Sequence, residues 1–177
     1  GSTGIRDVSF RVPAGSFTVL SGRVGSGKTT LLRSILGTLP ISDGCVRWNG
    51  KEIGDPKTFL VPPRCAYTPQ IPRLFSEPLR DNILLGMPED PVAISEAIRS
   101  GVMEEDIPTL ENGLDTIVGP RGVKLSGGQI QRAAATRMFY RNPDLLVFDD
   151  LSSALDVETE RTLWRRVFER SESTCLV

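Results

Sequence analysis

The strongest constraint on the fold is a glycine-rich segment at residues 22–29, which reads Gly-Arg-Val-Gly-Ser-Gly-Lys-Thr. It fits the pattern G-x-x-x-x-G-K-[ST]. The apolar residues at 17–20 favour a strand before this segment, and the apolar spacing over 28–37 favours a helix after it. A strand, a glycine loop and a helix in direct succession are typical of α/β proteins whose loop binds a phosphate group.

The residue types in this segment suit a nucleotide. Gly25 and Gly27 lack Cβ atoms, so the backbone can wrap closely around a phosphate. Lys28 can reach the β- and γ-phosphates, the Thr29 hydroxyl can ligate Mg²⁺, and Thr30 is expected to contact the α-phosphate. The alternative is a glycine-rich turn with a surface lysine, which the strand–loop–helix context disfavours. The nucleotide-binding residues expected here are Gly22, Arg23, Val24, Gly25, Ser26, Gly27, Lys28, Thr29 and Thr30.

Two carboxylates follow the apolar run at 145–148, which has the pattern of a buried parallel strand. Ligands of open α/β sheets bind beyond the carboxyl ends of the strands. Asp149 is therefore expected to hold Mg²⁺ beside Thr29, and Asp150 to polarise a water molecule near the γ-phosphate. The alternative is a pair of solvated turn residues.

A second helix start made of small residues lies at 125–129, Leu-Ser-Gly-Gly-Gln. Ser126 can cap the helix and also bond an anion. Gly127 and Gly128 leave their backbone N–H groups accessible to a phosphate. Taken alone, the segment could also be an ordinary capped helix start.

The remaining pattern predicts an α/β fold. Strands are expected at 5–10, 16–20, 45–48, 64–68, 145–148 and 174–177, and helices at 28–37, from 78 to 85, from 91, at 126–141 and at 157–170. On the helix from 91, Val92, Ile94, Ala97 and Ile98 are expected on one side, and on the last helix Leu163, Trp164, Val167 and Phe168 inward. The expected architecture is one domain over 1–177: a P-loop NTPase core with a mixed or parallel sheet, N-terminal antiparallel strands and a helical insertion over about 77–140. Residues 1–4 are expected to be a tag or linker, and both ends to be boundaries within a longer protein.

Composition narrows the chemistry. The chain has no histidine, and 21 Lys and Arg against 22 Asp and Glu give a net charge of −1. Without histidine there can be no Ser-His-Asp triad and no imidazole-bound zinc. Nucleic-acid binders usually carry a basic excess, so no nucleic-acid partner is expected. The three cysteines are far apart and odd in number, which indicates reduced thiols.

Five segments of the chain, taken in order, resemble motifs of the ATP-binding cassette family. They are the phosphate loop at 22–29, a Q-loop Tyr-Thr-Pro-Gln at 67–70, the signature at 125–129, the Asp-ended strand at 145–149 and a D-loop at 153–156. The stretches 69–75 with 81–83, and 116–122, resemble the Q-loop region and the X-loop of the exporter branch. The resemblance covers about residues 5–177.

The resemblance implies the nucleotide-binding domain of an exporter, with Mg²⁺-dependent ATP hydrolysis coupled to transport. Two cassettes would pair head to tail, with ATP between the phosphate loop of one and Ser126, Gly127, Gly128 and Gln129 of the other. Gln70 would contact Mg²⁺ or the attacking water, and Asp156 would lie at the dimer interface. The resemblance further implies a transmembrane domain, expected on the same polypeptide, and a place on the cytoplasmic face of a membrane. Lys28, Gln70 and Asp150 are the expected catalytic residues, and Thr29, Gln70 and Asp149 the expected metal ligands.

The chain departs from the family pattern at several points. Asp150 stands where the family usually has Glu, and a carboxylate about an ångström short can cost ~100-fold in rate. Pro120 stands where exporters usually have Glu. The adenine-stacking aromatic and the switch histidine are expected outside this chain. The alternatives left open are a poorly hydrolysing cassette of a heterodimeric transporter, a DNA-maintenance ABC-type ATPase and, least favoured, a small-molecule kinase.

Overall fold

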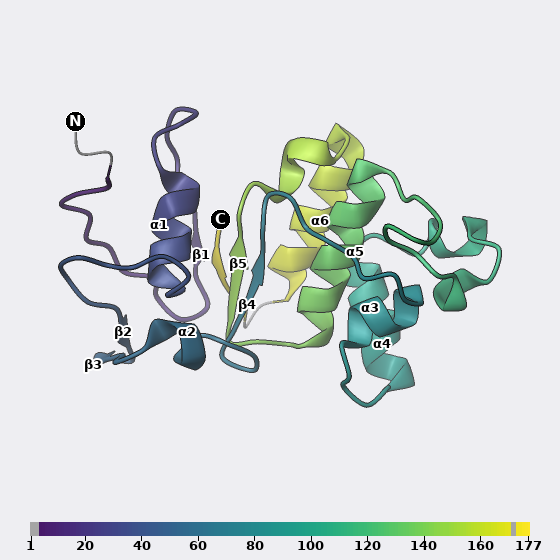
Figure 1. Ribbon diagram of the computed structural model, residues 1–177, viewed down its shortest axis with the longest axis horizontal. Coiled ribbons are helices and arrows are strands. Elements are labelled where there is room, and N and C mark those ends of the chain that lie inside the picture. The colour runs from purple at the N-terminus through teal and green to yellow at the C-terminus, as the bar shows by residue number, and fades with distance from the viewer. Residues whose placement is uncertain (1–3, 171–172) are drawn as a thin grey trace.

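The protein is described by a computed structural model that covers residues 4–170 and 173–177. Except for Gly4, the expected tag or linker at 1–4 lies outside the described residues. Figure 1 shows a central sheet seen along its edge, with helices on both sides and a further group of helices beyond one of them. The expected α/β class, with a parallel sheet, antiparallel strands and helices, is confirmed.

The central sheet has the strand order β1-β6-β5-β4. Its neighbouring strands are all parallel, and Leu146 on β5 lies between Ala66 on β4 and Cys175 on β6. The strands span Phe17–Thr18 (β1), Cys65–Thr68 (β4), Leu145–Phe148 (β5) and Thr174–Leu176 (β6). Because the strands are parallel, the residues that follow β4 and β5 emerge at one edge of the sheet.

Helices cover both faces of this sheet. Helix α1 (Lys28–Ile35) lies on one side, and α5 (Gly127–Tyr140) and α6 (Val157–Glu169) lie on the other (Figure 1). Side chains of a strand alternate between faces, so Leu145 and Val147 join the core on the α1 side while Leu146 and Phe148 join the core on the other side. All of β5 is therefore buried, as its continuous apolar run predicts.

The predicted helical region packs on the outer side of α5. It contains α3 (Leu79–Leu84), α4 (Pro91–Ser100) and two short 3₁₀ turns, η1 (Ile107–Thr109) and η2 (Gly113–Asp115). Helix α4 begins where predicted because Pro91 suits a first helical position and the Asp90 side chain accepts from the N–H groups of Val92 and Ala93. Helix α5 therefore connects the sheet to the helical region, and whether that region acts as a separate subdomain stays a prediction.

The strand expected at 5–10 is absent. The chain is extended there without a partner strand, and Val8 is 51% exposed. Alternating side chains favour a strand only where a neighbouring strand accepts the backbone hydrogen bonds, and none lies beside this segment in the described residues. The antiparallel pair lies instead at β2 (Arg47–Trp48) and β3 (Lys51–Glu52), on either side of Asn49 and Gly50.

Two side chains that were expected on the apolar faces of their helices are largely exposed, and one helix was not predicted. Val92, in the first turn of α4, is 67% exposed. Phe168 is also largely exposed, although its ring lies 4.6 Å from that of Phe17. Helix α2 (Pro56–Phe59), which Asp55 caps, is too short to leave an apolar period in the sequence.

Candidate nucleotide-binding site

The glycine-rich segment forms a curled loop directly before α1. Gly25 and Gly27 have φ values of 78° and 95°, in the left-handed region that favours glycine. The Ser26 N–H donates to the Arg23 carbonyl at 3.0 Å, and the Leu31 N–H donates to the Gly27 carbonyl at 2.8 Å, which starts the helical hydrogen bonds. The loop therefore ends at the positive end of a helix, with the geometry of an anion site.

The Lys28 ammonium group is folded over this loop. Its Nζ donates to the Gly22 carbonyl at 2.8 Å and to the Arg23 carbonyl at 3.3 Å. The Lys28 ammonium group is thus held at the loop, where it could contact a bound phosphate. The role of Lys28 at the β- and γ-phosphates stays a prediction.

Thr29 and Asp149, which are 120 residues apart, lie in contact. The Thr29 Oγ1 donates to Asp149 Oδ1 at 2.8 Å. Asp149 follows β5, is 4% exposed, and its backbone N–H donates to the Thr68 carbonyl at 3.0 Å, which continues the ladder with β4. Two of the three predicted magnesium ligands therefore lie together at the carboxyl edge of the sheet.

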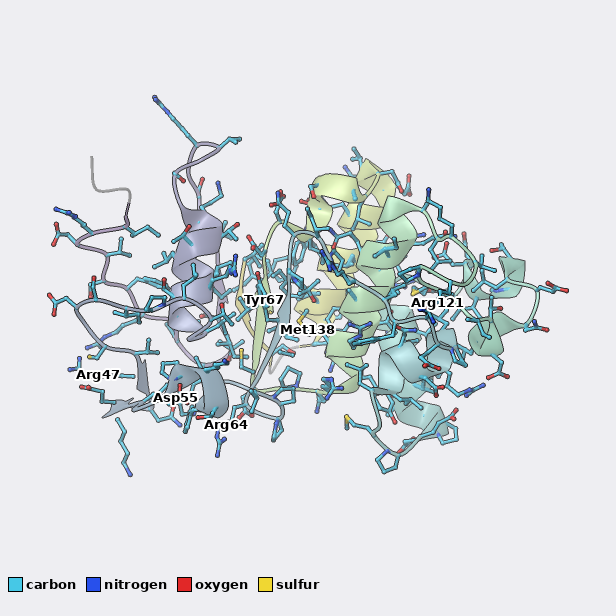
Figure 2. The ribbon with its side chains drawn as sticks, in the orientation of Figure 1. Arg47, Asp55, Arg64, Tyr67, Arg121 and Met138 are labelled. Carbon is cyan, nitrogen blue, oxygen red and sulfur yellow. The ribbon has the colours of Figure 1, made fainter. Side chains whose placement is uncertain are left out.

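Tyr67 lies in the Q-loop segment at 67–70, and sequence analysis assigned no role to its side chain. It lies on β4, on the side of the sheet that faces α1 (Figure 2), and its hydroxyl donates to Asp149 Oδ2 at 3.0 Å. Burial and the hydrogen bond to Asp149 raise the pKa of Tyr67 above its ordinary value, so the phenol stays a proton donor at neutral pH. The register that pairs Tyr67 with Val147 brings the two strands' ends together, and it cannot be read from the sequence.

Gln70 and Asp150 also meet. The Gln70 Nε2 donates to Asp150 Oδ2 at 2.8 Å, and Asp150 itself has a φ of 56°. The Gln70 carbonyl accepts from Gln131 Nε2 of α5 at 2.6 Å, a contact that sequence analysis did not predict. The amide and the carboxylate that were expected to handle water therefore lie side by side, beyond the ends of β4 and β5.

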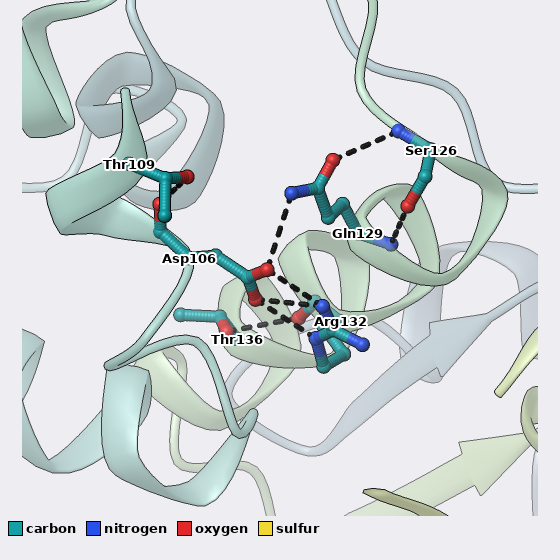
Figure 3. Close-up of polar contacts among 6 residues, drawn as sticks. All are labelled: Asp106, Thr109, Ser126, Gln129, Arg132 and Thr136. Carbon is teal, nitrogen blue, oxygen red and sulfur yellow. Dashed lines mark hydrogen bonds and ion pairs between the residues drawn. The ribbon is translucent and has the colours of Figure 1, made fainter. Parts of the chain in front are cut away.

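The predicted signature forms the N-terminus of α5, shown in Figure 3. The Gln129 N–H donates to Ser126 Oγ at 3.2 Å, and the Ser126 N–H donates to Gln129 Oε1 at 2.9 Å. This reciprocal capping box uses two backbone donors within the chain. Gln129 Nε2 in turn donates to Asp106 Oδ1 at 3.1 Å, so the Gln129 side chain shapes the helix start.

Asp106 fixes this helix start to η1 of the helical region. Arg132 donates from Nε and Nη2 to both Asp106 oxygens over 2.7–3.0 Å, and both side chains are mostly buried (Figure 3). Gly128 lies against the 3₁₀ turn η3 (Leu151–Ala154), where an added Cβ would be 3.0 Å from the Ala154 carbonyl oxygen. The signature glycines therefore contact the start of the predicted D-loop in the same chain.

The structure keeps the phosphate loop and the signature apart. Their helices, α1 and α5, lie on opposite sides of the sheet, and no hydrogen bond or ion pair given for the described residues joins the two segments (Figure 1). The fold thus brings together two pairs of predicted site residues, Thr29 with Asp149 and Gln70 with Asp150. The signature residues lie at a different helix start, at 126–129.

Fold and loop together define a nucleotide-binding α/β domain. The family model described as ABC transporter matches residues 5–153, and the chain belongs to this family. Membership implies that the chain binds ATP. In the described part of the chain, we find no helix with the length and hydrophobicity needed to cross a membrane.

Several relatives show the same family. YheI of Bacillus subtilis, a probable multidrug resistance ABC transporter ATP-binding/permease protein, is 35% identical over 169 residues, which is 95% of this chain and 29% of YheI. ABC transporter C family member 13 of Arabidopsis thaliana is 39% identical over 152 residues, 86% of this chain and 10% of that protein. A solved structure, a bacterial Atm1-family ABC exporter with ATP bound, superposes with a TM-score of 0.86 and 30% identity over 96% of this chain and 30% of that chain. The chain therefore spans less than a third of the length of these relatives.

Proposed function

We propose that this chain is the ATPase cassette of an ABC exporter, which binds ATP with Mg²⁺ and couples its hydrolysis to transport across a membrane. The observation that carries the proposal is the contact between Thr29 Oγ1 and Asp149 Oδ1 at the base of the glycine loop, with Lys28 folded over that loop. A hydroxyl, a carboxylate and a lysine in this arrangement suit the phosphates of a magnesium nucleotide.

The residues at the loop fit Mg²⁺. Thr29 and Asp149 supply oxygen atoms, the ligand type that Mg²⁺ prefers. The described residues contain no group of three or more His, Cys, Asp or Glu that could hold a metal alone. Magnesium sites commonly use one or two protein ligands and complete the shell with phosphate oxygens and water, so this donor set suits a metal that arrives with ATP. When bound, Mg²⁺ neutralises charge on the phosphates.

The other site residues have separate tasks in this proposal. Lys28 neutralises the β- and γ-phosphates, and the glycine loop with the start of α1 provides backbone donors. Gln70 and Asp150, in contact at 2.8 Å, orient and polarise the attacking water.

The proposal includes two partners. A second cassette, paired head to tail, supplies its signature to this phosphate loop, while Ser126, Gly127 and Gly128 of this chain serve the partner's nucleotide. The separation of α1 and α5 by the sheet supports this arrangement, since one chain cannot place both segments on one nucleotide. A permease domain on the same polypeptide is supported by relatives named ATP-binding/permease proteins, and it would place this chain on the cytoplasmic face of a membrane. The comparisons give no support to a DNA-maintenance ATPase.

Substitution of Lys28 tests the phosphate loop. We expect Lys28→Ala to weaken ATP binding about 10- to 100-fold, because hydrogen bonds to charged groups are worth about 1.5–3 kcal/mol. Binding is measured by the rise in unfolding temperature as ATP and Mg²⁺ are added. The control is Lys51→Ala on the exposed hairpin strand β3, which should leave the rise unchanged. Equal protection of the wild type and Lys28→Ala would overturn the proposal.

A further inference from the structure

We propose that Tyr67 is a positioning residue of the magnesium site: its hydroxyl holds one oxygen of Asp149 so that the other stays directed at Thr29. The inference rests on the proposed function and deepens it, because it assigns a residue outside the predicted ligand set to the metal. Three features of the structure support it: the contacts of the Asp149 carboxylate, the charge of that carboxylate and the partial exposure of Tyr67.

The two hydroxyls bind opposite oxygens of one carboxylate. Thr29 Oγ1 donates to Oδ1 at 2.8 Å, and Tyr67 donates to Oδ2 at 3.0 Å. The Asp149 backbone is fixed as well, by its hydrogen bond to the Thr68 carbonyl. Rotation of the carboxylate would break both side-chain contacts at once. The phenol therefore determines which way the Thr29-facing oxygen points.

Asp149 has no direct ion-pair partner among residues 4–170 and 173–177. Its carboxylate is nevertheless almost fully buried. Buried charges in proteins are paired or coordinate metals. In the described residues, the side-chain donors to this carboxylate are the neutral hydroxyls of Thr29 and Tyr67, an arrangement suited to a cation that comes from outside the chain. Hydrogen-bond donors around a metal ligand orient the metal-binding group.

Packing alone does not require this contact. The Tyr67 side chain is only partly buried, and its ring lies at the edge of the core on the α1 side. A phenol in such a place can turn its hydroxyl to water at little cost. The hydrogen bond to Asp149 is therefore a specific arrangement, and its loss should change the metal site more than the fold.

The experiment compares nucleotide affinity with and without metal. The probe is the non-hydrolysable analogue adenylyl imidodiphosphate, titrated calorimetrically into the 177-residue chain in Mg²⁺ and again in EDTA. The ratio of the two affinities measures what the protein gains from the metal. We expect Tyr67→Phe to lower this ratio about 10-fold, since loss of an outer-shell partner typically costs 10- to 100-fold in metal affinity. Affinity in EDTA should stay at the wild-type value.

The chain offers a matched control in its second tyrosine. Tyr140→Phe also removes a hydrogen-bonded hydroxyl, one that donates to the Pro88 carbonyl and accepts from the Asp90 N–H in the helical region. This variant should keep the wild-type ratio. An equal fall in both variants, or no fall in Tyr67→Phe, would overturn the inference.

Two further variants separate the possible outcomes. Tyr67→Met lacks the hydroxyl but fills irregular spaces, so it gives the same comparison should Tyr67→Phe fold poorly. In an Asp149→Asn background, the Tyr67→Phe substitution should have no additional effect, because both act on one metal site; an additive effect contradicts the inference. A wild-type chain that binds the analogue equally in Mg²⁺ and EDTA contradicts the proposed metal site itself, whereas a metal-dependent wild type with an unchanged Tyr67→Phe ratio contradicts only the role of Tyr67.

Discussion

The two neighbouring carboxylates after β5 have different surroundings. Asp149 is buried and accepts from the hydroxyls of Thr29 and Tyr67. Asp150 is exposed, has left-handed backbone geometry and accepts from Gln70. Asp149 is thus held in place on both sides, as a metal ligand must be, while Asp150 faces solvent, where a water molecule can reach it. Neighbours in the sequence can have separate roles because successive residues at a strand end point in different directions.

The length of the Asp150 side chain suggests slow hydrolysis. In the proposed exporter, we expect Asp150→Glu to raise the rate about 10- to 100-fold, since an ångström of misplacement can cost ~100-fold. Single-turnover hydrolysis of radiolabelled ATP measures the rate, and nucleotide affinity serves as the control, which should not change. If Asp150→Glu hydrolyses no faster than the wild type, the short side chain is not what limits the reaction.

Single residues were predictable where a local motif carried them. Lys28 and Thr29 belong to a loop whose spacing predicts its geometry, and in the structure Lys28 contacts the Gly22 carbonyl while Thr29 contacts Asp149. The contacts of Tyr67 and Gln131 were not predictable. Each joins segments at least 60 residues apart, and such contacts depend on strand register and helix packing, which leave no local pattern.

Among the elements, the start of α5 depends on residues outside the helix. Its capping box is visible in the sequence as Ser126 followed by Gln129. The hydrogen bonds from Gln129 and Arg132 to Asp106 are not visible in the sequence, because Asp106 lies at the start of η1 in the helical region. The predicted signature is therefore tied to the helical region by a mostly buried ion pair, so a shift of η1 would be transmitted to the helix start.

Removal of the Asp106 charge should destabilise the fold. We expect Asp106→Asn to lower the free energy of unfolding by about 2 kcal/mol, because the partly buried Arg132 loses its partner and hydrogen bonds to charged groups are worth about 1.5–3 kcal/mol. Urea unfolding measures the change. Asp115→Asn is the matched control: Asp115 pairs with Arg80 but is 68% exposed, so its loss should cost less than about 1 kcal/mol. Similar losses of unfolding free energy in both variants would show that the ion pair between Asp106 and Arg132 contributes no more than a surface ion pair.

Elements with their own start signals were predictable, and those that need a partner were not. Helix α4 begins at Pro91 after the Asp90 cap, as its local sequence predicts. The alternating residues at 5–10 predict a strand that does not form, because within residues 4–170 and 173–177 no strand lies beside them to complete the hydrogen bonds. A helix satisfies its backbone within one segment, whereas a strand needs a second segment.

At the scale of the whole molecule, the sheet separates two apolar cores. One lies under α1 and the other under α5 and α6 (Figure 1), and strands β4, β5 and β6 contribute residues to both. Cys65 therefore belongs to the core on the α1 side, and Cys175 to the opposite one. Burial raises the pKa of the Cys65 thiol to about 12 and that of the Cys175 thiol to about 11. Both thiols are therefore uncharged at neutral pH.

Thiol reactivity tests whether Cys65 and Cys175 are buried on the two faces of the sheet. The thiolate is the reactive form, so a buried thiol with a raised pKa reacts slowly, while the exposed Cys45 should react fast. We expect one rapid equivalent with Ellman's reagent at pH 8 in the folded chain and all three in denaturant, from the three cysteines present. Cys45→Ser should remove the rapid phase. A rapid phase that persists in Cys45→Ser would mean that one face of the sheet is open.

By itself, the sequence determined the class of the protein and the position of its glycine-rich loop between a strand and a helix. Glycine spacing, the lysine and the threonine act over a few residues, and such local patterns survive without knowledge of the rest of the chain. Only the tertiary structure decided which residues surround the Asp149 carboxylate and how Asp106 holds the start of α5. Those contacts arise when β4 pairs with β5 and the helical region packs on α5, because side chains from distant segments meet only after the layers have assembled.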